Sequence, residues 1–238
     1  MRVLGLDTAT RATTVALLDT DGGAVLEHRD DPPPGDRPRH TTRLLPLAAQ
    51  ALAEAGIDWS GISLIAVGTG PGTFTGIRIG IATARALACA REIPLAGVST
   101  LRALAAGAVG AVDGEERALA VLDARRREVF AGGWDPRAVD QAGVEPLLTP
   151  RALSPAALAE AITGSGERWL AVGDGVLAYR AQIEAAGARV PAEESPLHRV
   201  SAAEICRLAL TTPVGSADDV RPDYLREPDA ELRRAEVR

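Results

Sequence analysis

The chain has 238 residues, a formal net charge of −6 and a hydrophobic fraction of 46%. This length suits one domain or two compact lobes, and the hydrophobic fraction excludes a disordered chain. All 26 strongly basic residues are arginine, so the chain lacks the lysine that a P-loop or Schiff-base chemistry requires. The net negative charge argues against a chain that binds nucleic acid by itself.

The first half of the chain predicts three antiparallel strands, followed by helices and strands in alternation. Short apolar runs separated by turn residues indicate strands, whereas apolar residues at helical spacing indicate helices. The expected order is strands over 2–6, 12–18 and 24–29, a proline-rich loop over 31–39, a helix over 41–55, a strand over 62–68, a loop over 69–75, a helix over 76–91, a strand over 93–98 and a helix over 100–109.

The second half starts a similar but less regular plan. We expect a hairpin over 117–123 and 128–134 and helices over 154–162, 176–186 and 202–210. The arginine run 125–127 is interpreted as a solvated turn of the hairpin in preference to an RNA site. A glycine-rich boundary near 107–116 divides the chain into an N-terminal lobe, 1–108, and a smaller, degenerate C-terminal lobe, 109–238. The plan predicts an α/β fold of the actin-like ATPase (ribonuclease H-like) class, with two lobes that each hold a mixed sheet flanked by helices.

The cysteines and histidines are not spaced for a metal or disulfide site, and the hydropathy of the chain predicts no membrane segment. Cys89 and Cys206 lie in Ala/Leu-rich helical stretches and are interpreted as small buried hydrophobes. The three histidines lack metal-ligand spacing, so we expect no metal site. Arg2 and Asp7 interrupt any signal-peptide core, and no apolar run reaches membrane-spanning length. We therefore expect a cytoplasmic protein with no membrane contact.

A glycine-rich segment, VGTGPGTFTGIRIG at 67–80, is the most specific motif of the chain. It lacks the Walker lysine and breaks the G-x-G-x-x-G spacing, so it is either a structured turn or an anion site at the start of the next helix. Asp7 could hold a metal–nucleotide or cap a turn. The candidates for a vestigial phosphate loop are Asp7, Thr8, Thr10, Gly70, Gly72 and Thr73.

The helix over 76–91 carries a stripe of residues with almost no side chain, repeated every four residues. Such a stripe permits close approach of another helix or of a sheet, and a helix that is apolar nearly all round is buried on more than one side. With the preceding helix it predicts a partner interface, whose candidate residues are His40, Leu44, Leu45, Leu47, Ala48, Gly76, Ile77, Gly80, Ile81, Ala84 and Ala88. Gly80→Leu is accordingly expected to abolish partner binding and leave the monomer folded.

Several segments together resemble the TsaB (YeaZ) family. They are LGLDTATRATTVALLD at 4–19, RHTTRLLPL at 39–47, IAVGTGPGTFTGIRIGIATARALA at 65–88 and IPLAGVSTL at 93–101, with weaker matches at 120–130, 172–175 and 222–227. The resemblance implies an accessory subunit for the synthesis of N6-threonylcarbamoyladenosine (t6A) in tRNA. It also implies a related catalytic partner, TsaD, an ATPase, TsaE, contact with tRNA through the complex, and a homodimer when the chain is alone.

Two departures from the catalytic relative indicate a subunit without its own chemistry. Thr100 and Leu104 stand where that relative has a metal-binding His-x3-His, and the second hairpin lacks its Gly-Gly phosphate turn. We therefore expect no catalytic residues and no cofactor beyond a weakly held nucleotide at a partner interface. The alternatives are an actin-like ATPase or phosphotransferase and, last, a glycoprotease-like peptidase, for which no nucleophile set is found.

Overall fold

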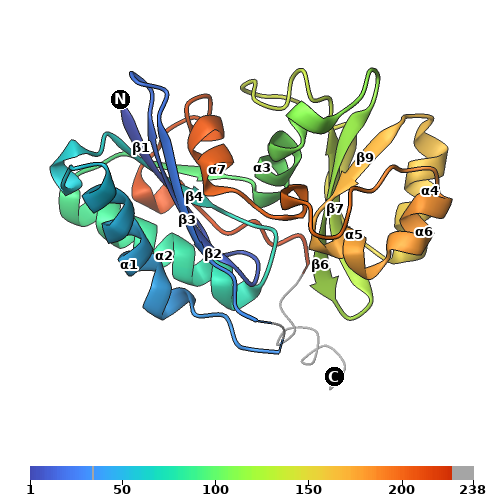
Figure 1. Ribbon diagram of the computed structural model, residues 1–238, viewed down its shortest axis with the longest axis horizontal. Coiled ribbons are helices and arrows are strands. Elements are labelled where there is room, and N and C mark those ends of the chain that lie inside the picture. The colour runs from blue at the N-terminus through green and yellow to red at the C-terminus, as the bar shows by residue number, and fades with distance from the viewer. Residues whose placement is uncertain (34, 227–238) are drawn as a thin grey trace.

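The computed structural model describes residues 1–33 and 35–226, which form two sheets with helices between and outside them (Figure 1). The first sheet has the strand order β3-β2-β1-β4-β5. Strands β1, β2 and β3 pair antiparallel, whereas β4 and β5 run parallel to β1. The strands are β1 (Arg2–Asp7), β2 (Thr13–Asp19), β3 (Val25–Asp30), β4 (Leu64–Gly68) and β5 (Leu95–Val98).

The second sheet repeats the plan with one strand fewer, in the order β8-β7-β6-β9. Its antiparallel part joins β6, β7 and β8, and β9 runs parallel to β6. The strands are β6 (Arg117–Arg125), β7 (Glu128–Trp134), β8 (Leu148–Leu153) and β9 (Trp169–Val172). Two mixed sheets flanked by helices confirm the predicted α/β, actin-like class.

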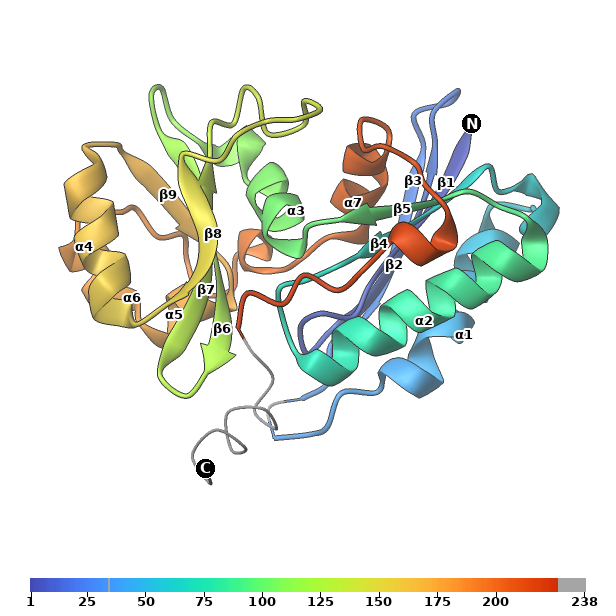
Figure 2. The same ribbon diagram turned by 180° about the vertical axis from the view of Figure 1, so that it is seen from behind.

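The helices form three layers around the two sheets (Figures 1 and 2). Helices α1 (His40–Glu54) and α2 (Phe74–Arg91) cover one face of the first sheet. Helices α3 (Thr100–Gly107) and α7 (Ala202–Ala209) fill the layer between the sheets. Helices α4 (Pro155–Ser165), α5 (Asp174–Ala178) and α6 (Arg180–Ala185) cover the outer face of the second sheet.

The predicted elements of the first half all form, with ends shifted by at most a few residues. In the second half, the hairpin and its turn at 125–127 form as expected. The helix expected over 176–186 is split, because Tyr179 has φ −130° and ends α5 before α6 begins. Strands β8 and β9 were not predicted. Pro150 argues against a strand in sequence, but β8 is an edge strand, where proline is tolerated.

The two cysteines differ in their surroundings. Cys206 is fully buried, and burial raises the pKa of its thiol to about 12. Cys89 is exposed on α2, so its predicted burial was wrong.

Among the described residues, no helix is both long enough and apolar enough to cross a membrane. The division into lobes 1–108 and 109–238 stays a prediction, since α7 from the second range packs on the first sheet.

Candidate functional site

The carboxyl group of Asp7 lies at the end of β1 and is fully enclosed. Its Oδ1 accepts the backbone N–H of Ala9 at 2.8 Å, and its Oδ2 accepts the hydroxyl of Thr100 at 2.8 Å. That hydroxyl accepts the N–H of Gly70 at 3.2 Å. Burial raises the pKa of Asp7 to about 6, although both hydrogen bonds act to lower it. Asp7 therefore links β1, the glycine-rich loop and α3, and both its carboxyl oxygens are engaged within the chain.

The other phosphate-loop candidates, Thr8, Thr10, Gly72 and Thr73, also lie together in the first lobe. Thr73 donates its N–H to the carbonyl of Ala9 at 2.7 Å, and the Thr8 hydroxyl donates to the carbonyl of Gly76 at 2.7 Å. A Cβ atom at Gly72 would overlap the Ala9 carbonyl, and Thr10 is half-buried. An anion site needs N–H groups that point at a ligand, whereas these groups hold the two loops to each other. The contacts favour the structured-turn alternative.

The side-chain-poor stripe of α2 faces the chain's own loops and sheet. A Cβ atom at Gly80 would overlap the Thr8 hydroxyl, and one at Gly76 would overlap the Thr8 carbonyl. Of the predicted interface residues, all but Leu45 are buried; they are His40, Leu44, Leu47, Ala48, Gly76, Ile77, Gly80, Ile81, Ala84 and Ala88. The His40 Nδ1 lies 2.9 Å from the Thr13 hydroxyl, inside the lobe. The close approach predicted for this stripe is thus made within the chain.

The opposite faces of the two helices are exposed and poor in charge, with Glu54 on α1 and Arg78 and Arg91 on α2 as their exposed charged residues. On α1 the exposed positions include Leu45, which is 47% exposed, and the alanines 49 and 53 at four-residue spacing. On α2 they include Phe74, Arg78 and the alanines 82, 86 and 90, again four residues apart. Residues at this spacing share one side of a helix. The inward face of α1 is therefore rich in leucine and that of α2 carries the glycine–alanine stripe, whereas both outward faces include alanines at four-residue spacing.

The two positions that were compared with a metal-binding His-x3-His lie on α3. Thr100 and Leu104 are both buried, and Leu104 packs in the core between α3 and the second sheet. Asp123 and Asp174 approach each other at the end of β6, where the Asp123 N–H donates to Asp174 Oδ1 at 3.0 Å. Within residues 1–33 and 35–226, no group of three or more His, Cys, Asp or Glu side chains is placed to hold a metal ion.

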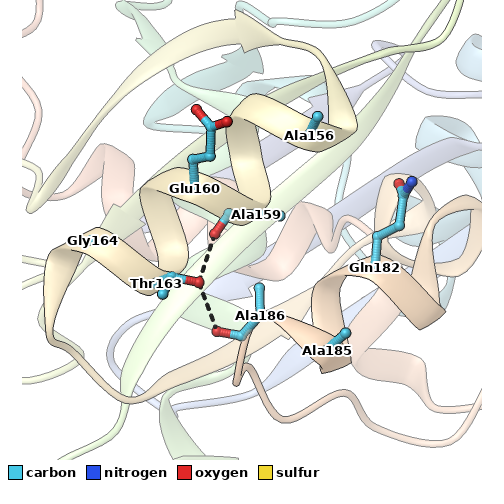
Figure 3. A pocket seen from close by; sticks show the side chains of 8 residues that line it. All are labelled: Ala156, Ala159, Glu160, Thr163, Gly164, Gln182, Ala185 and Ala186. Atoms are coloured by element: carbon cyan, nitrogen blue, oxygen red, sulfur yellow. Dashed lines mark hydrogen bonds between the residues drawn. The ribbon is translucent and has the colours of Figure 1, made fainter.

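A shallow pocket of about 630 Å³ lies far from these loops, between α4 and α6 on the outside of the second lobe (Figure 3). Its lining is mainly alanine, with Glu160 and Gln182 at the rim. The hydroxyl of Thr163 donates to the carbonyl of Ala159 at 3.0 Å, so it is engaged in its own helix. The pocket offers no converging set of polar groups for chemistry.

A cluster of aromatic rings and arginine was missed by the sequence interpretation. Tyr224 stacks on Phe74 with their ring centroids 5.4 Å apart, and the Arg78 guanidinium lies 3.6 Å from the centroid of Phe74. Arg78 Nε also donates to the Tyr224 hydroxyl at 2.8 Å. Nothing in the local sequence pairs residues 74 and 224, because the C-terminal segment reaches α2 only through the tertiary fold. Glu227, the last residue of the weak match at 222–227, lies outside the described residues.

Comparison with sequence families gives one extended match. The sequence model of the TsaD family, described as tRNA N6-adenosine threonylcarbamoyltransferase, matches residues 33–231. The tRNA threonylcarbamoyladenosine biosynthesis protein TsaB of Escherichia coli (strain K12) is 38% identical over 180 residues, which cover 75% of this chain and 74% of that protein. TsaB of Haemophilus influenzae is 34% identical over 130 residues, which cover 55% of this chain and 52% of that protein.

Comparison of folds gives the same result. The solved structure of YeaZ from Pseudomonas aeruginosa superposes with a TM-score of 0.76 and 32% sequence identity. The superposition covers 94% of this chain and 99% of that one. Both lobes and the helices between them are therefore shared with that structure.

Proposed function

Because this chain belongs to the TsaB (YeaZ) family, within the broader group that the TsaD family model describes, we propose that it is a non-catalytic subunit for the synthesis of t6A in tRNA. It would bind and activate a TsaD-like threonylcarbamoyltransferase. The observation that carries the proposal is the outward face of α1 and α2, which is solvent-exposed, poor in charge and lined with alanine.

The chemistry of that face suits a helical partner. Alanines at four-residue spacing let a second helix approach closely, as small residues do at helix crossings. Leu45 and Phe74 are large hydrophobic side chains that are 47% and 41% exposed, and both lie on these helices. Exposed apolar groups of this kind, gathered on one face, are typical of protein–protein contacts. The same face would serve a second copy of the chain when the catalytic partner is missing.

We therefore assign the partner interface to the exposed faces of α1 and α2 and no longer to the buried stripe of α2. Ala86→Glu places a charge on the exposed face of α2 and is expected to prevent co-purification with the TsaD-like protein of the same organism, while the circular dichroism spectrum stays unchanged. The matched control is Ala156→Glu, which adds the same charge at an exposed helical alanine of the second lobe. Undiminished co-purification of the Ala86→Glu variant would contradict the interface.

The non-catalytic role is supported by the state of Asp7. In an actin-like ATPase this aspartate must reach a metal–nucleotide, but here both carboxyl oxygens bind groups of the chain and the side chain is enclosed. Titration calorimetry of the isolated chain with Mg-ATP is expected to give no heat of binding. Micromolar binding would restore the ATPase or phosphotransferase alternative. The family resemblance also predicts that the complex, rather than this chain alone, binds a TsaE-like ATPase, tRNA and a weakly held nucleotide.

A further inference from the structure

The turn between β6 and β7 consists of three consecutive arginines in the left-handed backbone region. Arg125, Arg126 and Arg127 have φ values of 63°, 54° and 62°. Among the described residues, Glu92 is the one other non-glycine residue with a positive φ. Side chains with a Cβ atom are disfavoured there, and hairpin turns usually place glycine, asparagine or aspartate at such positions. The chain therefore keeps three arginines where the backbone favours other residues.

A hydrogen bond to the backbone holds the turn, and its arginine side chains remain exposed to solvent. The Asp123 carboxylate stabilises the backbone of the turn, since its Oδ1 accepts the N–H of Arg125 at 2.8 Å. The side chains of residues 125–127 are all exposed, and that of Arg125 remains 60% exposed although its Nη1 lies 3.0 Å from Asp123 Oδ2. A contact this open to solvent contributes little to stability. Strain at exposed, charged residues points to a role in binding rather than in folding.

The segment after α7 brings a further arginine to the turn. Arg226 Nη1 is 2.7 Å from the carboxylate of Glu128, the residue that follows the turn. Two residues earlier in the chain, Tyr224 stacks on Phe74, and the Arg78 guanidinium lies over the Phe74 ring. The same segment therefore contacts both the β6–β7 hairpin and the start of α2. Both views place the β6–β7 turn and the start of α2 at the same edge of the molecule (Figures 1 and 2).

We propose that the turn 125–127 binds the phosphate backbone of RNA, an inference that rests on the proposed function. Exposed guanidinium groups bind phosphate oxygens in pairs of hydrogen bonds, because their planar set of N–H donors matches the geometry of a phosphate. The chain as a whole is acidic, with a net charge of −6. Charges are screened beyond about 8 Å at physiological salt, so a local cluster of arginines still attracts a phosphate that touches it.

The test replaces the three arginines by glycine, in the full chain bound to its TsaD-like partner. Glycine adopts the left-handed region freely, so the melting temperature of the isolated chain should stay unchanged or rise. Affinity for tRNA should fall, and the slope of log K against log salt should become shallower by about 2 if three phosphate contacts are lost. A turn that only held the hairpin together would show the opposite pattern, with lower stability and unchanged RNA binding, and that result would overturn the proposal.

The control removes the same charge elsewhere, by Arg151→Gln, Arg168→Gln and Arg199→Gln, which are exposed positions outside the turn. The control should keep the salt slope of the unaltered complex. Equal slopes for the turn variant and this control would contradict the RNA assignment while the proposed function stands. Weakened binding of ADP with unchanged binding of tRNA would assign the turn to a nucleotide and equally contradict it. Failure of the unaltered chain to co-purify with the partner, measured before RNA is added, would overturn the proposed function and this inference together.

Discussion

At the residue scale, Asp7 of the predicted phosphate loop is held by groups of the chain itself. Its carboxyl group is enclosed between β1, the glycine-rich loop and α3, with hydrogen bonds from Ala9 and Thr100. Desolvation outweighs those bonds and raises the pKa of Asp7 to about 6. A carboxyl group whose pKa is higher in the folded state than in the unfolded chain binds its proton more tightly when folded. The free energy of unfolding must therefore decrease as pH rises through the interval between the two pKa values.

Asp7→Asn should remove this dependence on pH. The shift from 3.8 to about 6 corresponds to about 3 kcal/mol, so the stability of the variant relative to the unaltered chain should increase by up to that amount from pH 4 to pH 6. A constant offset is also expected, because the Asn amide presents N–H groups to the Thr100 hydroxyl. Urea unfolding at several pH values measures the difference.

Asp58→Asn is the control for that experiment. Hydrogen bonds from Ser60 lower the pKa of the exposed Asp58, so its contribution is lost as pH falls, which is the opposite direction. Parallel stability curves for the Asp7→Asn variant and the unaltered chain between pH 4 and pH 6 would refute the assignment.

At the scale of elements, α2 has two stripes of small residues that serve different purposes. The inward stripe allows the helix to lie directly on the loop that follows β1, where a Cβ atom at Gly76 or Gly80 would overlap Thr8. The alanines of the outward stripe, at positions 82, 86 and 90, are exposed in the part of the chain that the structure describes. The expectation that Gly80→Leu would leave the monomer folded was derived from helical spacing alone, and the close approach of Gly80 to Thr8 argues against it.

Gly80→Leu should instead destabilise the monomer. The larger side chain displaces Thr8 and breaks its hydrogen bond to the Gly76 carbonyl, which together should cost at least about 2–4 kcal/mol. The midpoint of urea unfolding measures the loss. Ala82→Leu on the exposed side of the same helix should change the midpoint little. Similar midpoints for the two variants would contradict the close packing of Gly80 against Thr8.

At the scale of the whole molecule, the C-terminal part of the chain completes the first lobe. Helix α7 covers the face of the first sheet opposite α1 and α2, and a Cβ atom at Gly5 would overlap Cys206. After α7 the chain runs along α2, where Arg85 Nη2 donates to the carbonyl of Val220 at 2.7 Å and Asp223 N–H donates to the carbonyl of Thr69 at 2.8 Å. Residues far apart in sequence thus share one core.

A chain that ends at residue 108 should consequently fail to fold, because the apolar face that α7 covers would be open to water. We expect low amide protection in hydrogen exchange and aggregation on concentration. A chain in which a flexible linker joins residue 108 to residues 199–226 should recover cooperative unfolding. If residues 1–108 alone give a cooperative transition, α7 is dispensable for the lobe.

Much of the candidate site could not be located from sequence, for one recurrent reason. The pattern at 76–88 identified a helix with a side-chain-poor stripe, but only the packing of Thr8 against Gly80 shows that the stripe faces inward. Likewise, Asp7 and Gly70 were identified as loop residues, whereas the hydroxyl of Thr100 that joins them comes from a third segment. A periodic pattern gives the relative positions of side chains on one element and carries no information on what covers each side.

The sequence alone determined the fold class, the first strand triplet, the second hairpin, the helices of the first lobe, the absence of lysine chemistry and the family resemblance. These depend on local spacing and composition, which act over a few residues. The tertiary structure decided which face of α2 is open, that α7 completes the first sheet, and that Tyr224 meets Phe74. Those features depend on contacts between residues distant in the chain, which form only when the whole core assembles.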